Sequence, residues 1–438
     1  MRNKIGIRRE NKDLTEKRAP LTPEQVKELI QRHKVKVVVE PSETRIFRDE
    51  QYREAGAEIS ADLSDCNIVF GVKEVPIPSL LPGKTLCFFS HTIKGQSYNM
   101  PMLKAILDLR ITLLDYEKVT DENGRRLIFF GPFAGYAGMI DTLWALGGRL
   151  QWEGISTPLV EIKQAMHYPS LEEAKQHIAQ VGEKITREGL PQSLLPMVVG
   201  FAGYGQVSRG AQEIFDLLPH QEISPSQLAE FYRSGKWSNR VIYKVVFREQ
   251  DMVRPKSPET TFELQDYYQH PEKYESRFEE YLPFLTVLVN GIYWEPRYPR
   301  LVTRAYLKQR WESGEKLPLR VIGDITCDIE GSIECNLKAT RSDNPIYVYR
   351  PLQGDSVDGW EGDGIVVLAV DKLPSELPRE ASESFGRALL PFVPALAAAD
   401  YSQPFESLDI PPEFKRALIA HQGSLTPDFR YLEKFLKG

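Results

Sequence analysis

A lysine and a histidine follow two successive apolar segments of the chain. Lys73 comes directly after NIVFGV at 67–72, and His91 directly after TLCFFS at 85–90. If both segments are strands of an open α/β sheet, both side chains lie at the edge that faces the ligand crevice. Lysine can act as a base when neighbouring cations lower its pKa, and histidine titrates near neutral pH. The two residues are candidates for a proton-transfer pair; the alternative is two unrelated surface residues.

Arginines in two other segments suit the binding of carboxylates. Arg18 lies in the loop between the first apolar segment and the first predicted helix, and Arg125 and Arg126 lie at the start of GRRLIFFG at 124–131, a predicted strand. A guanidinium group binds a carboxylate through two parallel hydrogen bonds. Surface salt bridging is the common alternative for any single arginine.

The segment at 197–211, MVVGFAGYGQVSRGA, has the pattern of a phosphate-binding turn. An apolar strand at 197–201 leads into Gly203 and Gly205, and a helix is predicted to begin near Gln206. The first glycine permits a tight turn, the second lets a pyrophosphate approach the backbone, and the helix N-terminus supplies free N–H groups. Ser208 takes the third small position. The pattern predicts dinucleotide binding, and a glycine-rich turn without a ligand is the alternative.

The identity of the dinucleotide depends on the next strand, which should carry an acid about 20 residues on if it binds the adenosine ribose. Glu222 has the right distance but lies in the middle of a predicted strand at 221–224, which ends at Ser224 without an acid. This favours NADPH and leaves NADH open. Arg209 or a more distant basic residue would then contact the 2′-phosphate.

These residues need a scaffold of alternating strands and helices, and the sequence has that alternation. Strands are predicted at 4–8, 35–40, 67–72, 85–90 and 111–117, and again at 284–294, 319–326 and 364–370. Helices are predicted at 22–33, with Thr22 as N-cap, and at 99–109, 134–151, 170–189 and 377–399, the last broken near Pro391. This order is typical of an α/β protein with mostly parallel sheets. The polar stretch 249–282 is interpreted as a surface excursion.

Composition excludes several classes of function. The 438 residues carry a formal net charge of −6 without a broad basic patch, so nucleic acid is not an expected partner. No apolar run reaches the roughly 20 residues of a membrane helix, and the N-terminus has no apolar signal core. Four cysteines show neither CxxC pairs nor metal-ligand spacing, which predicts reduced thiols, no metal site and a cytoplasmic protein.

Eight segments together resemble one family of enzymes. They occur in the order RRENKDLTEKRAPLTPEQV, FGVKE, FFSHTIKGQ, LLDYEKVTDENGRRLIFFGPFAGYAGMID, GFAGYGQVSRGAQEIFDLLP, VNGIYWE, GDITCDIEGSIE and LPREASESFGRALLPF. The chain resembles lysine–ketoglutarate reductase, the lysine-forming saccharopine dehydrogenase that is the N-terminal half of bifunctional aminoadipic semialdehyde synthase. More distantly it is similar to alanine dehydrogenase and the related transhydrogenase domain.

The resemblance implies a fold and a reaction. The fold is α/β, with two Rossmann-like domains and the active site between them; we expect residues 1–150 plus 385–438 to form the substrate domain and 151–384 the dinucleotide domain. The reaction condenses L-lysine with 2-oxoglutarate and reduces the imine to saccharopine with a nicotinamide cofactor, or runs in reverse. Because the sequence ends at residue 438, we expect a separate glutamate-forming saccharopine dehydrogenase as a partner enzyme.

The resemblance also implies a role for each site residue. Lys73 would be the general base and His91 the general acid in the oxidative direction. Arg18 and Arg126 would hold substrate carboxylates. The remaining pocket residues would be Gln96, Phe130 and Tyr293, with Glu74 and Glu117 favouring the protonated lysine and histidine. The dinucleotide would meet Gly203, Gly205, Gln206, Val207, Ser208, Arg125 and Asp324.

Two other functions stay open at this point. One keeps the fold and changes the substrate, as in alanine dehydrogenase or another amino-acid or opine dehydrogenase. The other is a non-catalytic regulator that binds a dinucleotide. The presence of Lys73, His91, Arg18 and Arg126 together argues against the regulator, which would need none of them.

Overall fold

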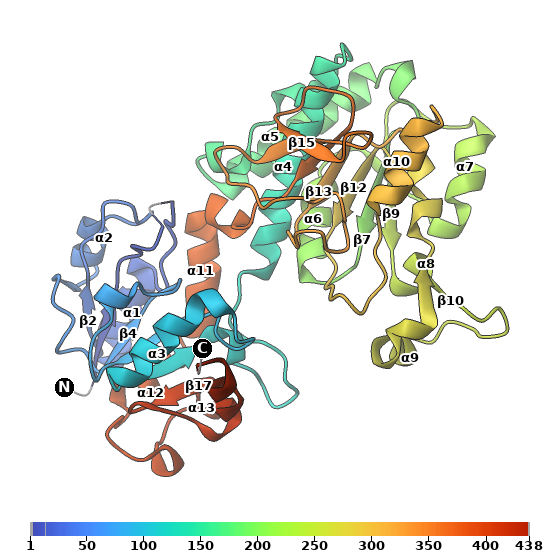
Figure 1. Cartoon of the computed structure of the whole chain (residues 1–438). Helices are drawn as coiled ribbons and strands as arrows, with labels where there is room; N and C mark the ends of the chain where they lie inside the picture. The colour runs from blue at the N-terminus through green and yellow to red at the C-terminus, as the bar shows by residue number, and fades with distance from the viewer. Residues whose placement is uncertain (1–2, 14, 437–438) are drawn as a thin grey trace. The chain divides into compact units, whose positions relative to one another are not determined.

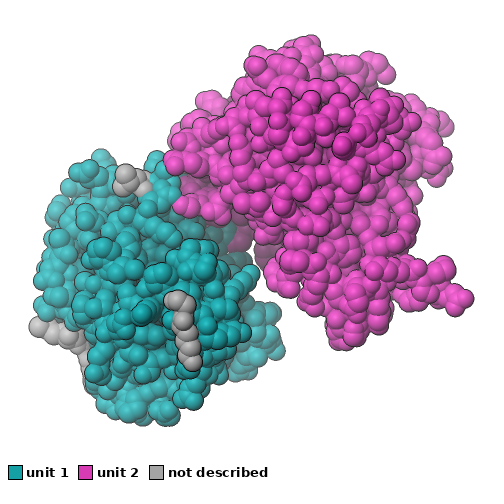
Figure 2. All heavy atoms as spheres, viewed as in Figure 1, with its two compact units in different colours: residues 1–130, 378–438 teal, residues 131–377 magenta. Residues whose placement is uncertain are grey.

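The structure, a computed structural model, describes residues 3–13 and 15–436 and divides into two compact units. Unit 1 comprises residues 1–130 and 378–438, and unit 2 comprises residues 131–377 (Figure 2). The boundaries expected from the sequence, after 150 and after 384, fall inside α4 (Gly131–Trp152) and α11 (Pro378–Leu389). The chain changes unit at the N-terminal ends of these two helices.

Unit 1 is built on an eight-stranded sheet in the order β18-β17-β6-β5-β4-β1-β2-β3. Strands β1 to β6 are parallel, and β17 joins β6 in the antiparallel direction. The strands are β1 (Lys4–Ile7), β2 (Lys36–Val39), β3 (Glu58–Ile59), β4 (Ile68–Phe70), β5 (Thr85–Phe88), β6 (Thr112–Asp115), β17 (Leu418–His421) and β18 (Ser424–Leu425). The sequence did not indicate β17, which comes from the far end of the chain.

The helices of unit 1 follow the local signals of the sequence. At the start of α1 (Pro23–His33), Gln25 N–H donates to Thr22 Oγ1 and Thr22 N–H donates to Gln25 Oε1, which confirms the predicted capping box. Helix α11 ends at Leu389 and α12 (Val393–Ala398) begins four residues later, so the break near Pro391 is also confirmed. The other helices are α2 (Asp49–Glu54), α3 (Met100–Asp108) and α13 (Pro412–Lys415).

Unit 2 contains a second eight-stranded sheet, in the order β15-β14-β16-β13-β12-β7-β9-β8, with helices on its faces (Figure 1). The strand pairs from β16 to β8 are parallel, whereas β14 pairs in the antiparallel direction with both β16 and β15. The strands are β7 (Val198–Ala202), β8 (His220–Glu222), β9 (Ile242–Phe247), β12 (Val287–Asn290), β13 (Val321–Asp324), β14 (Ile346–Arg350), β15 (Asp355–Asp358) and β16 (Ile365–Leu368). The helices include α5 (Leu171–Glu188), α6 (Gln206–Phe215), α7 (Leu228–Ser234) and α10 (Arg304–Glu312).

Two glycines let α4 and α6 pack at backbone contact. A Cβ atom at Gly135 would collide with the carbonyl oxygen of Val207, and one at Gly210 would collide with that of Pro132. Since backbone atoms cannot move aside as a flexible side chain can, these positions require glycine. The glycine at 210, which falls outside the dinucleotide pattern, therefore serves helix packing.

The polar stretch 249–282 forms an arm that projects from unit 2 beyond β9 (Figure 1). It contains α8 (Glu249–Met252), α9 (Leu264–Gln269) and an antiparallel pair of β10 (Val253–Pro255) with β11 (Tyr274–Ser276). Its charged side chains are largely exposed, as expected, but its aromatic rings pack together; Tyr267 lies 5.3 Å from Tyr274 between ring centroids. The arm is thus an ordered element with its own apolar centre.

The strand predicted at 124–131 is wrong. Residues 120–126 instead form a turn closed by a β-bridge between Thr120 and Arg126, with Gly124 in the left-handed region at φ +75°. Ile128 is buried and Phe130 stacks on Phe385, so this segment contributes side chains to the core without joining the sheet. The apolar residues are explained by packing alone, which a pattern of hydrophobicity cannot distinguish from strand pairing.

Two carboxyl groups face each other inside unit 2. Asp141 of α4 and Glu376 are 0% and 4% exposed. Ala165 N–H donates to Asp141 Oδ1 at 2.7 Å and Asp141 Oδ2 has no other donor among the described residues, while the Ser342 side chain and the Met166 backbone interact with Glu376. Burial, reinforced by the charge of Asp141, raises the pKa of Glu376, and burial also raises the pKa of Asp141. A proton shared between the two groups supplies the missing donor.

Replacing Gly135 with alanine should destabilise unit 2 by about 1–3 kcal/mol, because the new methyl group has no room against Val207. Gly205→Ala is the matched control: a Cβ there meets no described atom within 4 Å, so a change below about 0.5 kcal/mol is expected. All six tryptophans fall within 131–377. Tryptophan fluorescence during urea denaturation therefore reports unit 2, and equal effects of both substitutions would contradict the packing argument.

Replacing Glu376 with glutamine should flatten the dependence of unit 2 stability on pH. In the folded wild type the pair retains a proton that the unfolded chain releases above a pKa near 4.5, so stability falls as pH rises from that value through the raised pKa values. The glutamine amide donates a hydrogen bond but does not titrate. We therefore expect the free energy of unfolding of the variant to exceed that of the wild type by about 1–3 kcal/mol between pH 5 and pH 8. The control Glu361→Gln, at an exposed position, should show the same dependence of stability on pH as the wild type. Parallel curves for Glu376→Gln and wild type would refute the shared proton.

Candidate functional site

Lys73 and His91 follow the carboxyl ends of two neighbouring parallel strands, β4 and β5. His91 adopts a left-handed backbone at φ +49°, and its Nδ1 lies 2.8 Å from Glu74 Oε1. Its ring stacks on Phe89 at 6.2 Å between centroids, and 29% of the side chain stays exposed. The histidine is held in one orientation, with part of the ring open to a reactant.

Glu74 is an anion at neutral pH in spite of being buried. Burial alone would raise its pKa, but the hydrogen bond and charge of His91 and the charge of Lys12, whose Nζ lies 3.1 Å away, hold that pKa well below its usual range. A carboxylate on Nδ1 favours the tautomer with the proton on that nitrogen, which leaves Nε2 to accept or deliver a proton. Glu74, which was expected to act on the lysine and histidine through its charge, thus contacts the histidine; the tuning itself stays a prediction.

A second buried carboxylate fixes the backbone around Lys73. Glu10 Oε1 accepts a hydrogen bond from Val72 N–H at 2.8 Å, and Oε2 accepts one from Lys73 N–H at 3.0 Å. Burial raises the pKa of Glu10, and Arg8 at 3.6 Å opposes this effect. The sequence analysis missed Glu10, although an acid just after the first strand lies at the same sheet edge as Lys73.

Arg18 lies at the same edge but is already engaged. Its Nε and Nη2 donate to Glu16 at 2.7 and 2.6 Å, and only 4% of the residue is exposed. Burial would raise the pKa of Glu16, but the charge and hydrogen bonds of Arg18, with a contribution from Lys73, lower it. A substrate carboxylate would meet a guanidinium group with two of its three nitrogens in use.

An aromatic layer connects the two arginines with the histidine. The guanidinium of Arg18 lies 4.2 Å from the ring centroid of Phe130, and that of Arg126 lies 5.5 Å from the ring of Phe89. Phe89 and Phe130 are 6.0 Å apart, and Phe89 also stacks on His91. Five predicted residues of unit 1 therefore gather at one edge of its sheet: Arg18, Lys73, His91, Arg126 and Phe130.

Three other predicted residues of unit 1 lie near this edge with different contacts. Gln96 is half-buried and accepts a hydrogen bond from Lys94 N–H at 3.1 Å. Arg125 is exposed and pairs with Asp121 at 2.7 Å. Glu117 N–H donates to Asp115, whose pKa rises to about 6 through burial and then through the charge of Glu117. The tuning of lysine and histidine by Glu117 stays a prediction.

The glycine turn of unit 2 has the geometry that the sequence predicted. Gly203 has φ +94° and Gly205 is the N-cap of α6. The space in which a Cβ of Gly205 would lie is open to 4 Å, which leaves room for a phosphate beside the first turn of α6. Ser208 Oγ donates to the Gly203 carbonyl at 2.7 Å and so pins the turn, while Gln206 is exposed and Val207 half-buried.

Glu222 does not lie on the strand that neighbours the glycine-turn strand β7. Strand β8 ends at Glu222 and lies at the sheet edge, so the strand beside β7 is β9. Arg248 follows directly after β9, and its guanidinium lies 5.1 Å from the ring centroid of Tyr204 in the glycine turn. The apolar run before Arg248 could have indicated this strand. The expected spacing of about 20 residues from the glycine turn favoured the earlier strand instead.

Two further residues assigned to the site lie in unit 2. Asp324, at the end of β13, is 1% exposed and accepts hydrogen bonds from Asn290 Nδ2, Asn336 Nδ2 and Thr326 Oγ1. Burial raises its pKa in spite of these bonds. It braces the ends of β12 and β13 from within. Tyr293 is 70% exposed, and its hydroxyl donates to Glu295, which raises the pKa of Tyr293 to about 12.

Two other kinds of feature are absent from the described residues. Within 3–13 and 15–436, no three histidine, cysteine or acidic side chains cluster as metal ligands would. The same ranges contain no helix with the length and apolarity needed to cross a bilayer.

Comparison with known proteins adds relationships to this geometry. Residues 6–137 match the family model described as alanine dehydrogenase/PNT, N-terminal domain, and residues 272–428 match the corresponding C-terminal domain. Among solved structures, an L-alanine dehydrogenase aligns over 99% of both chains with a TM-score of 0.62 at 19% identity. A transhydrogenase from Sinorhizobium meliloti aligns over 97% of this chain and all of the other with a TM-score of 0.58 at 16% identity. These two show a shared α/β fold.

Curated relatives are more similar in sequence. Alpha-aminoadipic semialdehyde synthase of Arabidopsis thaliana is 42% identical over 99% of this chain and 41% of its own length, and the mitochondrial synthase of Bos taurus is 37% identical over 98% and 47%. The chain thus spans less than half the length of these relatives. A saccharopine dehydrogenase [NAD(+), L-lysine-forming] of Emericella nidulans is 28% identical over 89% of this chain and 91% of its own. The chain belongs to the group of proteins that combine the two alanine dehydrogenase/PNT domains, and nearly all of it is homologous to part of alpha-aminoadipic semialdehyde synthase.

Proposed function

We propose that this chain is a nicotinamide-dependent oxidoreductase of lysine metabolism that joins L-lysine and 2-oxoglutarate into saccharopine, or cleaves saccharopine in reverse. The observation that carries the proposal is the placement of Lys73 and His91 at adjacent strand ends, with Glu74 on His91 Nδ1 at 2.8 Å. Homology to the synthases and to the lysine-forming saccharopine dehydrogenases supports the choice of substrates.

The residues of unit 1 have distinct tasks in this reaction. The carboxylate of Glu74 holds the His91 ring through Nδ1, so that the other ring nitrogen is positioned to deliver a proton in the oxidative direction. Lys73 acts as the base in that direction, and the roles exchange in reduction. Arg18 and Arg126, set on the aromatic layer, attract the carboxylates of the keto acid and amino acid.

The glycine turn of unit 2 fits a dinucleotide. The open space beside Gly205 and the free N–H groups of α6 suit a pyrophosphate, which Ser208 supports by pinning the turn. When bound, the nicotinamide supplies or receives the hydride. Arg125 is exposed and paired with Asp121, so we assign it only a contact with the dinucleotide at the protein surface.

The second strand position favours NADPH over NADH. Arg248 follows β9 directly, where an acid would otherwise receive the ribose hydroxyls, and an arginine at this place accommodates a 2′-phosphate. The neighbouring acid, Glu249, accepts a hydrogen bond from Tyr268 at 2.7 Å and is thereby held toward the arm. In this proposal Arg248 makes the contact with the 2′-phosphate that was expected of Arg209 or a more distant basic residue.

The double substitution Lys73→Met with His91→Gln should lower turnover of lysine and 2-oxoglutarate by about 10²-fold or more, since each group contributes roughly 10²–10⁴-fold to proton transfer. Dinucleotide affinity should change little, because both residues lie in unit 1. Turnover is read as loss of nicotinamide absorbance, with alanine or ornithine replacing lysine and pyruvate replacing 2-oxoglutarate as substrate controls. Exposed Lys94→Met is the matched variant. Near-normal turnover in the double variant, or a preference for pyruvate, would refute the proposal.

Replacing Arg248 with glutamate should lower kcat/KM for NADPH about tenfold or more and leave that for NADH much less affected, because only NADPH presents the 2′-phosphate. The control is Arg233→Glu, an exposed arginine of α7 in the same unit. The ratio of kcat/KM for the two cofactors is the measurement. A ratio unchanged by the substitution would remove Arg248 from the cofactor site.

A further inference from the structure

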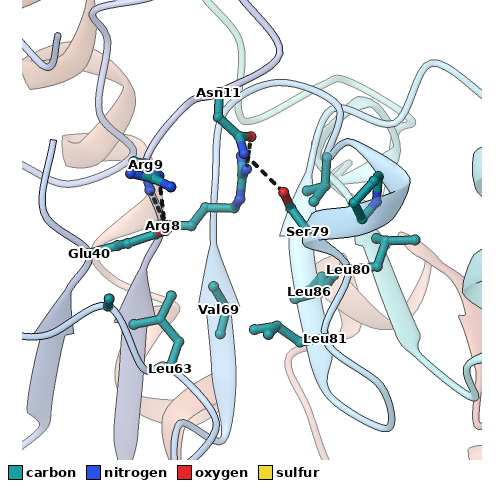
Figure 3. Close-up of a pocket in the computed structure, with 13 residues that line it drawn as sticks. Arg8, Arg9, Asn11, Glu40, Leu63, Val69, Ser79, Leu80, Leu81 and Leu86 are labelled. Carbon is teal, nitrogen blue, oxygen red and sulfur yellow. Dashed lines mark hydrogen bonds and ion pairs between the residues drawn. The ribbon is translucent and has the colours of Figure 1, made fainter.

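Unit 1 has a pocket beside the carboxyl ends of β1 and β2, with a volume of about 200 Å³ (Figure 3). Its apolar walls include Leu63, Val69 and Leu86, and its polar side consists of Arg8, Asn11 and Ser79. Lys73, His91, Arg18 and Arg126 do not line it. The pocket is therefore separate from the residues assigned to the reaction, although it opens at the same edge of the sheet, where ligands bind in open α/β folds.

Arg8 gives the polar side a guanidinium group in which one nitrogen, although paired with Glu10, makes no hydrogen bond. It is 6% exposed, and its Nη2 donates to Asn11 Oδ1 at 2.5 Å (Figure 3). Its buried Nη1 has no hydrogen-bond partner among the described residues, and the nearest acid found there, Glu10, is at 3.6 Å. A buried donor without an acceptor is costly, so a ligand that offers an acceptor here recovers that cost. Gly71 leaves space for the side chain, since a Cβ there would lie 2.9 Å from Arg8 Cδ.

We propose that this pocket binds a small aliphatic carboxylate. The guanidinium group selects a carboxylate, the leucine and valine walls select a branched or linear alkyl chain, and the volume excludes a dinucleotide. An aliphatic amino acid and the corresponding acid without its amino group share this chemistry. Glu40 lies at the rim, where it pairs with Arg9 at 3.1 Å, and it offers an additional contact to an ammonium group.

The pocket is coupled to Lys73 through Glu10. The same carboxylate that faces Arg8 accepts the backbone hydrogen bonds of Val72 and Lys73. A ligand carboxylate on Arg8 weakens its attraction to Glu10 and strengthens the hold of Glu10 on the Lys73 backbone. We therefore expect a ligand in the pocket to change the turnover of the enzyme. This effect on turnover rests on the proposed function, whereas binding of the ligand to the pocket does not.

Titration calorimetry of the full chain with L-leucine and with 4-methylpentanoate tests the site. We expect saturable binding of at least one probe, one per chain, with Kd of about 1 mM. Ala61→Phe, at an exposed position of the pocket lining, should raise this Kd at least tenfold, as should Arg8→Gln. Arg126→Ala should leave it unchanged, which separates the pocket from the substrate site. Tighter binding of L-leucine would identify the amino acid as the ligand, and tighter binding of 4-methylpentanoate the simple acid.

Two results would overturn the proposal: no saturable binding of either probe at millimolar concentration, or binding that Ala61→Phe does not weaken. Turnover is measured separately. Binding with unchanged turnover would refute the coupling through Glu10, and loss of the proposed reaction itself would leave the calorimetry interpretable because it needs no catalysis.

Discussion

The site of unit 1 depends on one interaction, the pair of hydrogen bonds that Glu10 accepts from the backbone of Val72 and Lys73. These bonds join the segment after β1 to the segment after β4, two places more than 60 residues apart in the chain. Parallel strands bring their carboxyl ends to one edge, but they do not align the loops that follow. The buried carboxylate does so, and the lysine, its neighbour Glu74 and the bound histidine follow from that alignment.

The buried charged side chains around this edge occur in pairs of opposite sign. Glu16 lies against Arg18, Glu74 against His91 and Lys12, and Glu10 against Arg8, so each buried charge has an opposite partner. Buried ions persist only when they are paired and hydrogen-bonded. The aromatic rings beneath the arginines exclude water from one side, which strengthens these attractions. A substrate with carboxylates and an amine would therefore meet both positive and negative side chains that are already held in place.

Local signals were sufficient for much of this structure, and non-local pairing explains the rest. The capping box of α1, the left-handed Gly203 and the break between α11 and α12 each depend on a few adjacent residues, and each was predicted. The place of β9 between β7 and β8, and hence the role of Arg248, depends on which strands pair across the sheet. Glu10 was missed for the same reason, because its partners lie 62 and 63 positions away. In segment 124–131, burial produced a hydrophobic pattern without strand pairing.

The return of the chain to unit 1 after residue 377 has a consequence for synthesis on the ribosome. Strand β17 extends the sheet beside β6, and Phe385 of α11 stacks on Phe130 in the aromatic layer. Both come from residues 378–438, so residues 1–130 have an incomplete core until unit 2 and that segment have been made. Unit 2 is continuous in sequence and can fold first, whereas unit 1 closes only after residues 378–438 have been made. During that interval the open edge of β6 is exposed to aggregation, and chaperone binding would act mainly on this half of the nascent protein.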